Sequence, residues 1–188
     1  MVTFFFILSY FFCEEKRVSN LDTLISIYND YDISQTLLVD SCIISEETKL
    51  LFAGIDIYGR NQYLLDSALV SWELMGKEAE KLGLKLFLVS GYRSYAYQAG
   101  IIKRKIDRGI MIEDILKFNK LPGLSEHHSG RAIDISNDKN TGLSITFENT
   151  EEYLWLLENA ENFGFRLTYK KDNSFDIMFE PWHWYYYK

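Results

Sequence analysis

The residues best suited to acid–base and metal chemistry gather in two short parts of the sequence. All three histidines and both prolines lie within residues 122–128 and 181–183. A catalytic zinc site uses three nitrogen or oxygen ligands and keeps one position open for water. The side chains that could form such a site, with a carboxylate nearby as a base, are His127 or His128, Asp134, His183 and Glu180. On spacing alone, a surface histidine pair and a core histidine packed between tryptophans are open alternatives.

The overall composition excludes several classes of protein. The chain has 188 residues, and 27 acidic against 20 basic side chains give it a net charge of −7. This length fits one domain, and 47% hydrophobic residues argue against bulk disorder. An acidic chain without a long basic run is not expected to bind nucleic acid, because such binding depends on neutralising phosphates. Two cysteines, Cys13 and Cys42, cannot form a disulfide scaffold.

The elements that position these residues can be read from apolar spacing. A helix is predicted over residues 62–82, because apolar residues recur every three or four positions and Gly83 follows as a stop. Further helices are expected at 95–107, 112–119 and 150–163, the last with a capping signal formed by Asn149 and Glu152. The predicted strands are 85–89, 132–135, 165–169, 174–179 and 182–187.

These elements do not alternate as regular βα units, which favours an α+β fold with a small antiparallel sheet flanked by helices. Residues 14–60 are expected to wrap the core as strands and loops, around the apolar runs 37–39, 42–44 and 49–53. The basic run at 103–105 is interpreted as a solvated helix face.

The N-terminus suggests export. Residues 1–13 form an apolar segment of about ten residues that ends in Cys13, too short for a confident membrane span, which needs ~20. The cysteine and the polar residues after it resemble the modified cysteine of a bacterial lipoprotein. Lipid attachment at Cys13, cleavage of the segment and an uncleaved hydrophobic helix are all open.

Three ordered motifs carry a resemblance to a known family. Residues 90–94 read S-G-Y-R-S, and Gln98 follows the arginine by five residues. Residues 125–134 read S-E-H-H-S-G-R-A-I-D, and residues 180–183 read E-P-W-H. Together they resemble VanY-type D-alanyl-D-alanine carboxypeptidases, zinc peptidases related to VanX-type dipeptidases and to lysostaphin- and hedgehog-like domains. The resemblance covers residues 61–188 and implies a peptidase domain there, with its zinc site on the sheet.

The resemblance also assigns roles to individual residues. It implies that His127, Asp134 and His183 hold Zn²⁺ and that Glu180 is the general base. It implies substrate binding by Arg93, Gln98 and Ser125, with the arginine forming two hydrogen bonds to a carboxylate; a structural salt bridge is the alternative for this arginine. Trp182 and Trp184 are expected either to line the pocket or to pack in the core.

One geometric demand follows from these roles. Glu180 and His183 are three residues apart, so a regular strand would place their side chains on opposite faces. The chain must therefore bend at Pro181 if both are to reach one metal ion.

The resemblance implies a zinc-dependent D,D-carboxypeptidase of the cell envelope that acts on peptidoglycan stem peptides outside the cytoplasm. An L,D-carboxypeptidase or a D,D-dipeptidase of the same family is the neighbouring alternative. Two alternatives of another class are a catalytically silent wall-binding module and an acidic envelope scaffold. The sequence does not indicate the oligomeric state.

Overall fold

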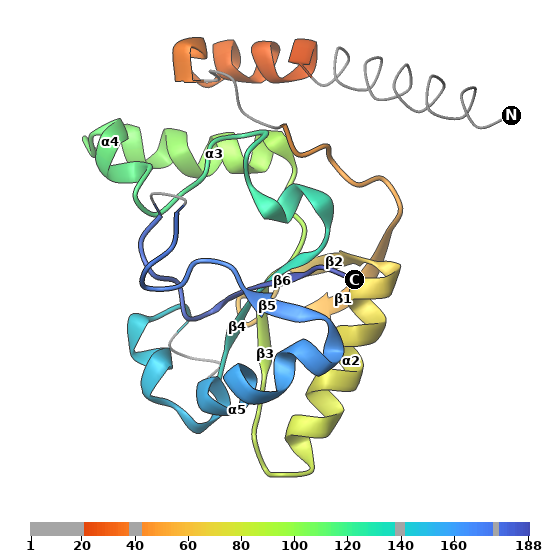
Figure 1. Ribbon diagram of the computed structural model, residues 1–188. Helices are drawn as coiled ribbons and strands as arrows, with labels where there is room; N and C mark the ends of the chain where they lie inside the picture. Colours follow the sequence, from red (N-terminus) through yellow and green to blue (C-terminus); the bar gives the residue numbers. More distant parts are fainter. Residues whose placement is uncertain (1–20, 38–42, 138–141, 175–176) are drawn as a thin grey trace, which may run out of the picture.

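The computed structural model describes residues 21–37, 43–137, 142–174 and 177–188 (Figure 1). The apolar segment 1–13, with Cys13, lies outside these ranges, so the expectations about it are untested. Among the described residues, no helix combines the length and hydropathy needed to cross a membrane.

Four antiparallel strands form the central sheet, in the order β3-β4-β6-β5. Their bounds are Phe87–Ser90 for β3, Ala132–Ser136 for β4, Phe165–Leu167 for β5 and His183–Tyr186 for β6. A separate antiparallel hairpin pairs β1, Leu50–Ile55, with β2, Asn61–Leu65. The predicted α+β fold with small antiparallel sheets flanked by helices is thus confirmed.

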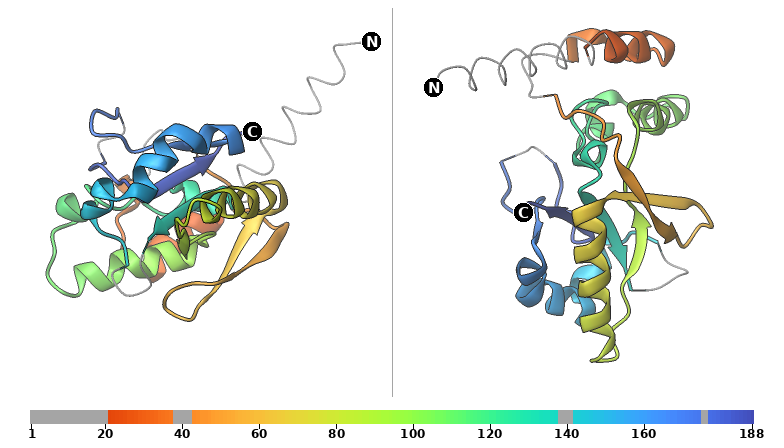
Figure 2. Two further views of the ribbon diagram at one scale, coloured as in Figure 1. Left: turned by 90° about the horizontal axis from the view of Figure 1, so that it is seen from below. Right: turned by 90° about the vertical axis from the view of Figure 1, so that its right-hand side faces the viewer.

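Two helices cover one face of the central sheet (Figures 1 and 2). These are α2, Asp66–Glu80, and α5, Glu151–Asn159. Their buried side chains include Trp72, Met75 and Leu156, which share one core with Ile133 and Ile135 of β4. Because side chains alternate along a strand, Asp134 points to the opposite face, away from this core.

A second core lies on the other side of the site. Residues 21–30 are helical and pack with α3, Tyr95–Ile106, and α4, Ile112–Ile115. The helix 21–30 and α3 lie together at one end of the molecule, at the top of Figure 1. Short 3₁₀ helices connect the elements: η1 at Gln35–Leu37, η2 at Glu126–Ser129, η3 at Ile145–Asn149 and η4 at Ala160–Phe163.

The helix predicted over 62–82 begins later than its spacing suggested. Residues 61–65 form strand β2, in which Gln62 and Leu64 are buried and their neighbours are exposed or half-buried, a period of two rather than 3.6. The helix ends at Glu80, two residues before the predicted end, and Gly83 is the predicted stop, with a φ of +79° and a hydrogen bond from the Leu84 N–H to the Ala79 carbonyl.

Other boundaries also differ from the prediction. The sequence predicts strands and loops over residues 21–30, but these residues are helical. The run 49–53 lies largely in β1, whereas 38–42 are outside the described residues. Of the 112–119 helix, only α4 forms as an α-helix. The described part of 174–179 contains no strand. Helix α5 is capped by Thr150, whose Oγ1 accepts from the Tyr153 N–H, and not by Asn149.

Candidate metal centre and active site

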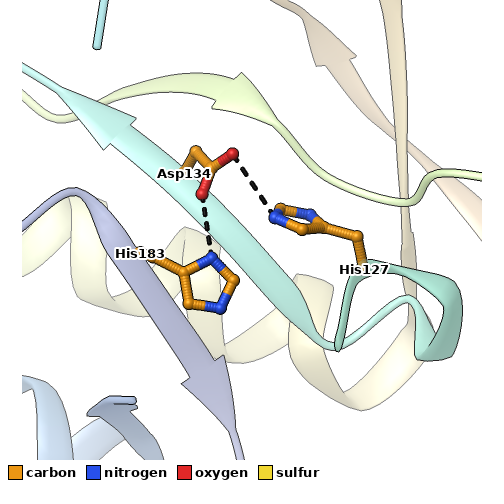
Figure 3. A group of neighbouring side chains, drawn as sticks. All are labelled: His127, Asp134 and His183. Carbon is orange, nitrogen blue, oxygen red and sulfur yellow. Dashed lines mark hydrogen bonds and ion pairs between the residues drawn. The ribbon is translucent and has the colours of Figure 1, made fainter. Parts of the chain in front are cut away.

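The register of the central sheet brings two of the predicted metal ligands together. Asp134 of β4 pairs directly with His183 of β6, and directly opposite residues in an antiparallel pair have their Cβ atoms about 5 Å apart. Both side chains are 2% exposed, and His183 Nδ1 lies 3.0 Å from Asp134 Oδ1. Figure 3 shows the two groups meeting on one face of the sheet. Strand pairing alone therefore places two of the three candidate ligands.

His127 reaches the same point from the short helix η2. Its Nδ1 lies 2.6 Å from the Gly91 carbonyl oxygen, so Nδ1 carries the proton and Nε2 is free to face Asp134 Oδ2 at 3.3 Å (Figure 3). The turn after η2 requires Gly130, which has a φ of +66° and whose added Cβ would lie 2.7 Å from Leu50 Cδ2. The turn at Gly130 thus helps to place the imidazole, and the Gly91 carbonyl sets its tautomer.

His128, the other candidate in the histidine pair, has a structural role. Its Nδ1 lies 2.7 Å from the Arg93 carbonyl oxygen, and its Nε2 accepts a hydrogen bond of 3.1 Å from the Gly123 N–H. Burial lowers the pKa of His128 to about 4, which keeps Nε2 available as an acceptor. This imidazole ties the loop before η2 to the segment that carries Arg93.

The donor set fits a zinc ion. Donor atoms of His127, Asp134 and His183 all lie within 4.8 Å of one another, and all three residues are buried. Two imidazole nitrogens and one carboxylate oxygen match the ligands of catalytic zinc, which bind at about 2.0–2.2 Å and leave a fourth position open. The three residues that the sequence singled out are therefore brought together in an arrangement able to hold this metal.

Burial and neighbouring charges give the two candidate histidine ligands different protonation states. Burial and the neighbouring Arg93 lower the pKa of His127 to about 4, so its ring is neutral at pH 7. Burial alone would lower the pKa of His183, but hydrogen bonds to Asp134 and Glu126 raise it to about 10. Burial would raise the pKa of Asp134, yet His127 and Arg93 hold it well below its usual range. Asp134 is thus a carboxylate, and His183 must lose a proton to bind a metal.

The chain bends where the sequence required it. Residues 181 and 182 form a turn, and the His183 N–H donates to the Glu180 carbonyl at 3.1 Å before β6 begins. Glu180 is 9% exposed and lies in the same cavity as His183. Burial raises the pKa of Glu180 to about 7, against the opposing effect of His183. A carboxyl with a pKa near neutrality can both take up and give back a proton at pH 7.

A cavity of about 210 Å³ contains the three donors, Glu180 and the three predicted substrate-binding residues Arg93, Gln98 and Ser125. Arg93 Nη2 is also ion-paired with Asp134, and its Nε donates to Ser90 Oγ at 2.8 Å. The Gln98 Nε2 donates to the Lys120 carbonyl, while its Oε1 has no partner. Trp182 lines the cavity, whereas Trp184 is packed in the core. A larger hollow of about 1010 Å³ beside α2 holds none of these residues.

Among the residues that sequence reasoning missed at this site are two charged ones, Glu126 and Lys105. Glu126 Oε2 lies 2.9 Å from His183 Nε2, on the side of the ring away from Asp134. Lys105 lines the cavity, so its interpretation as part of a solvated helix face is wrong. Glu126 adjoins a ligand in the second motif, which was a usable signal. Nothing in the basic run distinguished Lys105 from its neighbours.

This fold and its buried two-histidine, one-aspartate group define a candidate metal-dependent enzyme. Residues 61–188 match the VanY family, described as D-alanyl-D-alanine carboxypeptidase, and the chain belongs to this family. The family predicted from the three motifs is thereby confirmed.

Individual relatives agree with this assignment. The D-alanyl-D-alanine carboxypeptidase of Enterococcus faecium is 28% identical over 165 residues, which are 85% of this chain and 49% of the relative. The solved structure of the LD-carboxypeptidase LdcB has a TM-score of 0.66 and 30% identity, covering 75% of this chain and 69% of LdcB. A mutant of the vancomycin resistance D,D-pentapeptidase VanY, solved in complex with Zn(II), has a TM-score of 0.58 and 26% identity. The match covers 78% of this chain and 87% of the VanY chain. The chain spans about half the length of the curated relatives it matches first.

Proposed function

We propose that this protein is a zinc-dependent D,D-carboxypeptidase that removes the terminal D-alanine from peptidoglycan stem peptides. The observation that carries the proposal is the placement of Glu180, a buried carboxyl with a pKa raised to about 7, in one cavity with the three metal donors. Membership of the VanY family supports the substrate class.

Zinc held by His127, Asp134 and His183 would supply a Lewis acid that polarises the scissile carbonyl and lowers the pKa of bound water. Glu180 takes a proton from the attacking water and later gives it to the leaving amine. The C–N bond between the two D-alanine residues breaks, and the water oxygen joins the carbonyl carbon. Free D-alanine and the shortened stem peptide are the products.

The predicted substrate-binding residues have polar atoms available for a peptide. Arg93 uses Nε and Nη2 within the protein, and its Nη1 forms no hydrogen bond among the described residues. Gln98 Oε1 is buried without a partner and can accept an N–H from the substrate. Ser125 is 4% exposed and lies beside η2. We assign carboxylate or carbonyl recognition to Arg93 and backbone recognition to the other two.

One observation favours a second reaction of the same kind. The structure of the LD-carboxypeptidase LdcB matches 75% of this chain with a TM-score of 0.66, and the VanY mutant structure matches 78% with a TM-score of 0.58. An L,D-carboxypeptidase would use the same zinc and the same base, but would accept a tetrapeptide stem. The difference then depends on the wall of the cavity and not on the metal donors.

Purified protein should be incubated with pentapeptide and tetrapeptide stems and with D-Ala-D-Ala, with and without a chelator. We expect mass spectrometry to show loss of one alanine from the pentapeptide, and no loss after chelation. Cleavage of the tetrapeptide alone would identify an L,D-carboxypeptidase, and cleavage of the dipeptide alone a D,D-dipeptidase. Full activity in a metal-free preparation would refute the mechanism. Binding of stems without any cleavage would identify a silent wall-binding module.

The same function places the protein at the cell envelope, on the extracytoplasmic side. Attachment to the membrane through Cys13 belongs to this proposal. The mass of the mature N-terminus, measured in the native membrane fraction, tests it: a lipid-modified cysteine supports attachment, and an unmodified chain contradicts it.

A further inference from the structure

Lys105 is a cation of the cavity that the proposed mechanism does not use. It lies near the C-terminal end of α3, is partly buried, and lines the cavity together with Arg93 and Gln98. Its Nζ donates to the neutral Asn119 Oδ1. Among the described residues, no carboxylate lies within salt-bridge distance of this ammonium group. Its charge is thus held at the cavity without a carboxylate in direct contact, although Glu180 lines the same cavity.

The helix aims two polar side chains at the same place. Gln98 and Lys105 are seven residues apart on α3, about two turns, and so project from one face. Their ends reach consecutive residues of one loop, because Gln98 Nε2 donates to the Lys120 carbonyl and Lys105 Nζ donates to Asn119. Gln98 is 1% exposed, and its Oε1 has no partner. This end of the cavity therefore offers an ammonium whose described partner is a neutral amide, and a buried acceptor without a partner.

The electrostatic setting favours an anion at this point. Burial lowers the pKa of Lys105, and the like charge of Arg93 lowers it further, while Glu180 opposes this. Arg93 is itself turned toward the metal centre by its ion pair with Asp134 and its bond to Ser90. A partly desolvated ammonium is stabilised when a carboxylate binds next to it.

We propose that Lys105 is a specificity-determining residue that binds a carboxylate of the substrate peptide. The inference rests on the proposed function, because it takes the substrate to be a stem peptide. Such a peptide offers two sources of this chemistry: the C-terminal carboxylate, and a side-chain carboxylate on the residue before the D-alanines when that residue is diaminopimelate.

The two sources can be separated with matched peptides. The first ends in acetyl-lysine-D-Ala-D-Ala as a free acid, the second carries diaminopimelate in place of lysine, and the third is the first peptide as a C-terminal amide. For the two acids, kcat/KM is measured; for the amide, the inhibition constant is measured. The proteins are the zinc-loaded wild type, Lys105→Met and Lys105→Arg, with Lys103→Met as a control on the same helix. Lys103 is bonded to Asp107 and lies outside the cavity.

We expect Lys105→Met to lower kcat/KM by roughly 10- to 100-fold for peptides that carry the recognised carboxylate, the size of a hydrogen bond to a charged group. A loss for both acids with an unchanged amide identifies the C-terminal carboxylate. A loss for the diaminopimelate peptide alone identifies the side chain. Lys105→Arg should keep most of the activity, and Lys103→Met should match the wild type.

Two results would overturn the inference while leaving the proposed function intact. One is a Lys105→Met enzyme equal to the wild type on every peptide. The other is an equal loss on all three peptides, amide included, which would indicate a general effect on the fold. If the wild type cleaves neither acid, the proposed function fails, and the inference fails with it.

Discussion

His183 is held between two carboxylates, and this sets its chemistry. Its Nδ1 lies 3.0 Å from Asp134 and its Nε2 lies 2.9 Å from Glu126, and the hydrogen bonds raise its pKa to about 10 although burial opposes this. A metal ligand must present a deprotonated nitrogen. Because Nδ1 faces Asp134, that nitrogen would hold the metal, and Glu126 is placed to keep the proton on Nε2.

Zinc affinity should therefore depend on pH with a definite sign. Below its pKa of about 10, His183 is protonated, so zinc uptake releases one proton, while His127, with a pKa of about 4, releases none. We expect the affinity to rise about tenfold per pH unit between pH 6 and 8. Competition with a chromophoric chelator, corrected for the chelator's own protonation, measures this. An affinity that does not change with pH would contradict the assignment of His183.

Glu126 should affect the metal without touching it. We expect Glu126→Ala to weaken zinc binding by roughly 10- to 100-fold, because the ring of His183 loses the partner that orients it. Glu126→Gln keeps an acceptor and should lose less. The chelator competition reports both, with the exposed Glu158→Ala as a control. Equal affinities in all four proteins would show that Glu126 does not position the ring.

At the scale of elements, the site is assembled by strand β2 and the loops it holds. The Tyr92 N–H donates to the Tyr63 carbonyl, and the Leu65 N–H donates to the Gly130 carbonyl. Strand β2 therefore holds both the segment after β3 that contacts the His127 ring and the turn that follows His127 in the chain. Gly91 must be a glycine here, because an added Cβ would lie 2.7 Å from the Tyr63 carbonyl oxygen.

This arrangement explains what the sequence could and could not predict. The family resemblance of the ordered motifs predicts His127, Asp134 and His183 as ligands, and the strand predicted over 132–135 corresponds to β4. The helix predicted over 62–82 is wrong for the residues of β2, because Leu65 and Leu69 fit a helical spacing that continues into α2. The pairing of strands 49 residues apart, on which the site depends, arises only from tertiary packing.

Gln62 is the side chain that connects the β1–β2 hairpin to the segment that contacts His127. Its Nε2 donates to Asp56 and its Oε1 accepts from the Gly91 N–H, both at 2.8 Å, and Gly91 in turn accepts from His127. We expect Gln62→Ala to lower the free energy of unfolding by about 1–3 kcal/mol, because buried partners are left unpaired. Urea denaturation measures this, with the exposed neighbour Asn61→Ala as a control. Similar curves for both variants would show that this network does not stabilise the hairpin.

At the scale of the whole molecule, the site lies between two separate cores. One core joins the sheet to α2 and α5, and the other joins residues 21–30 to α3 and α4. The protein carries a net charge of −7, yet Arg93 and Lys105 bring positive charge into this cavity. Electrostatic attraction for an anionic substrate is therefore confined to this cavity, where Arg93 and Lys105 lie.

Metal binding should stabilise the whole fold, because the three donors come from η2, β4 and β6. A ligand at 100 times its Kd adds about 2.7 kcal/mol to stability. For a chain of this size, that corresponds to a rise of about 5–10 °C in the unfolding midpoint. Calorimetry with zinc and after chelation tests this, and magnesium, which prefers oxygen ligands, should give little change. His127→Ala should respond far less to zinc; an equal rise in this variant would place the stabilising ion elsewhere in the molecule.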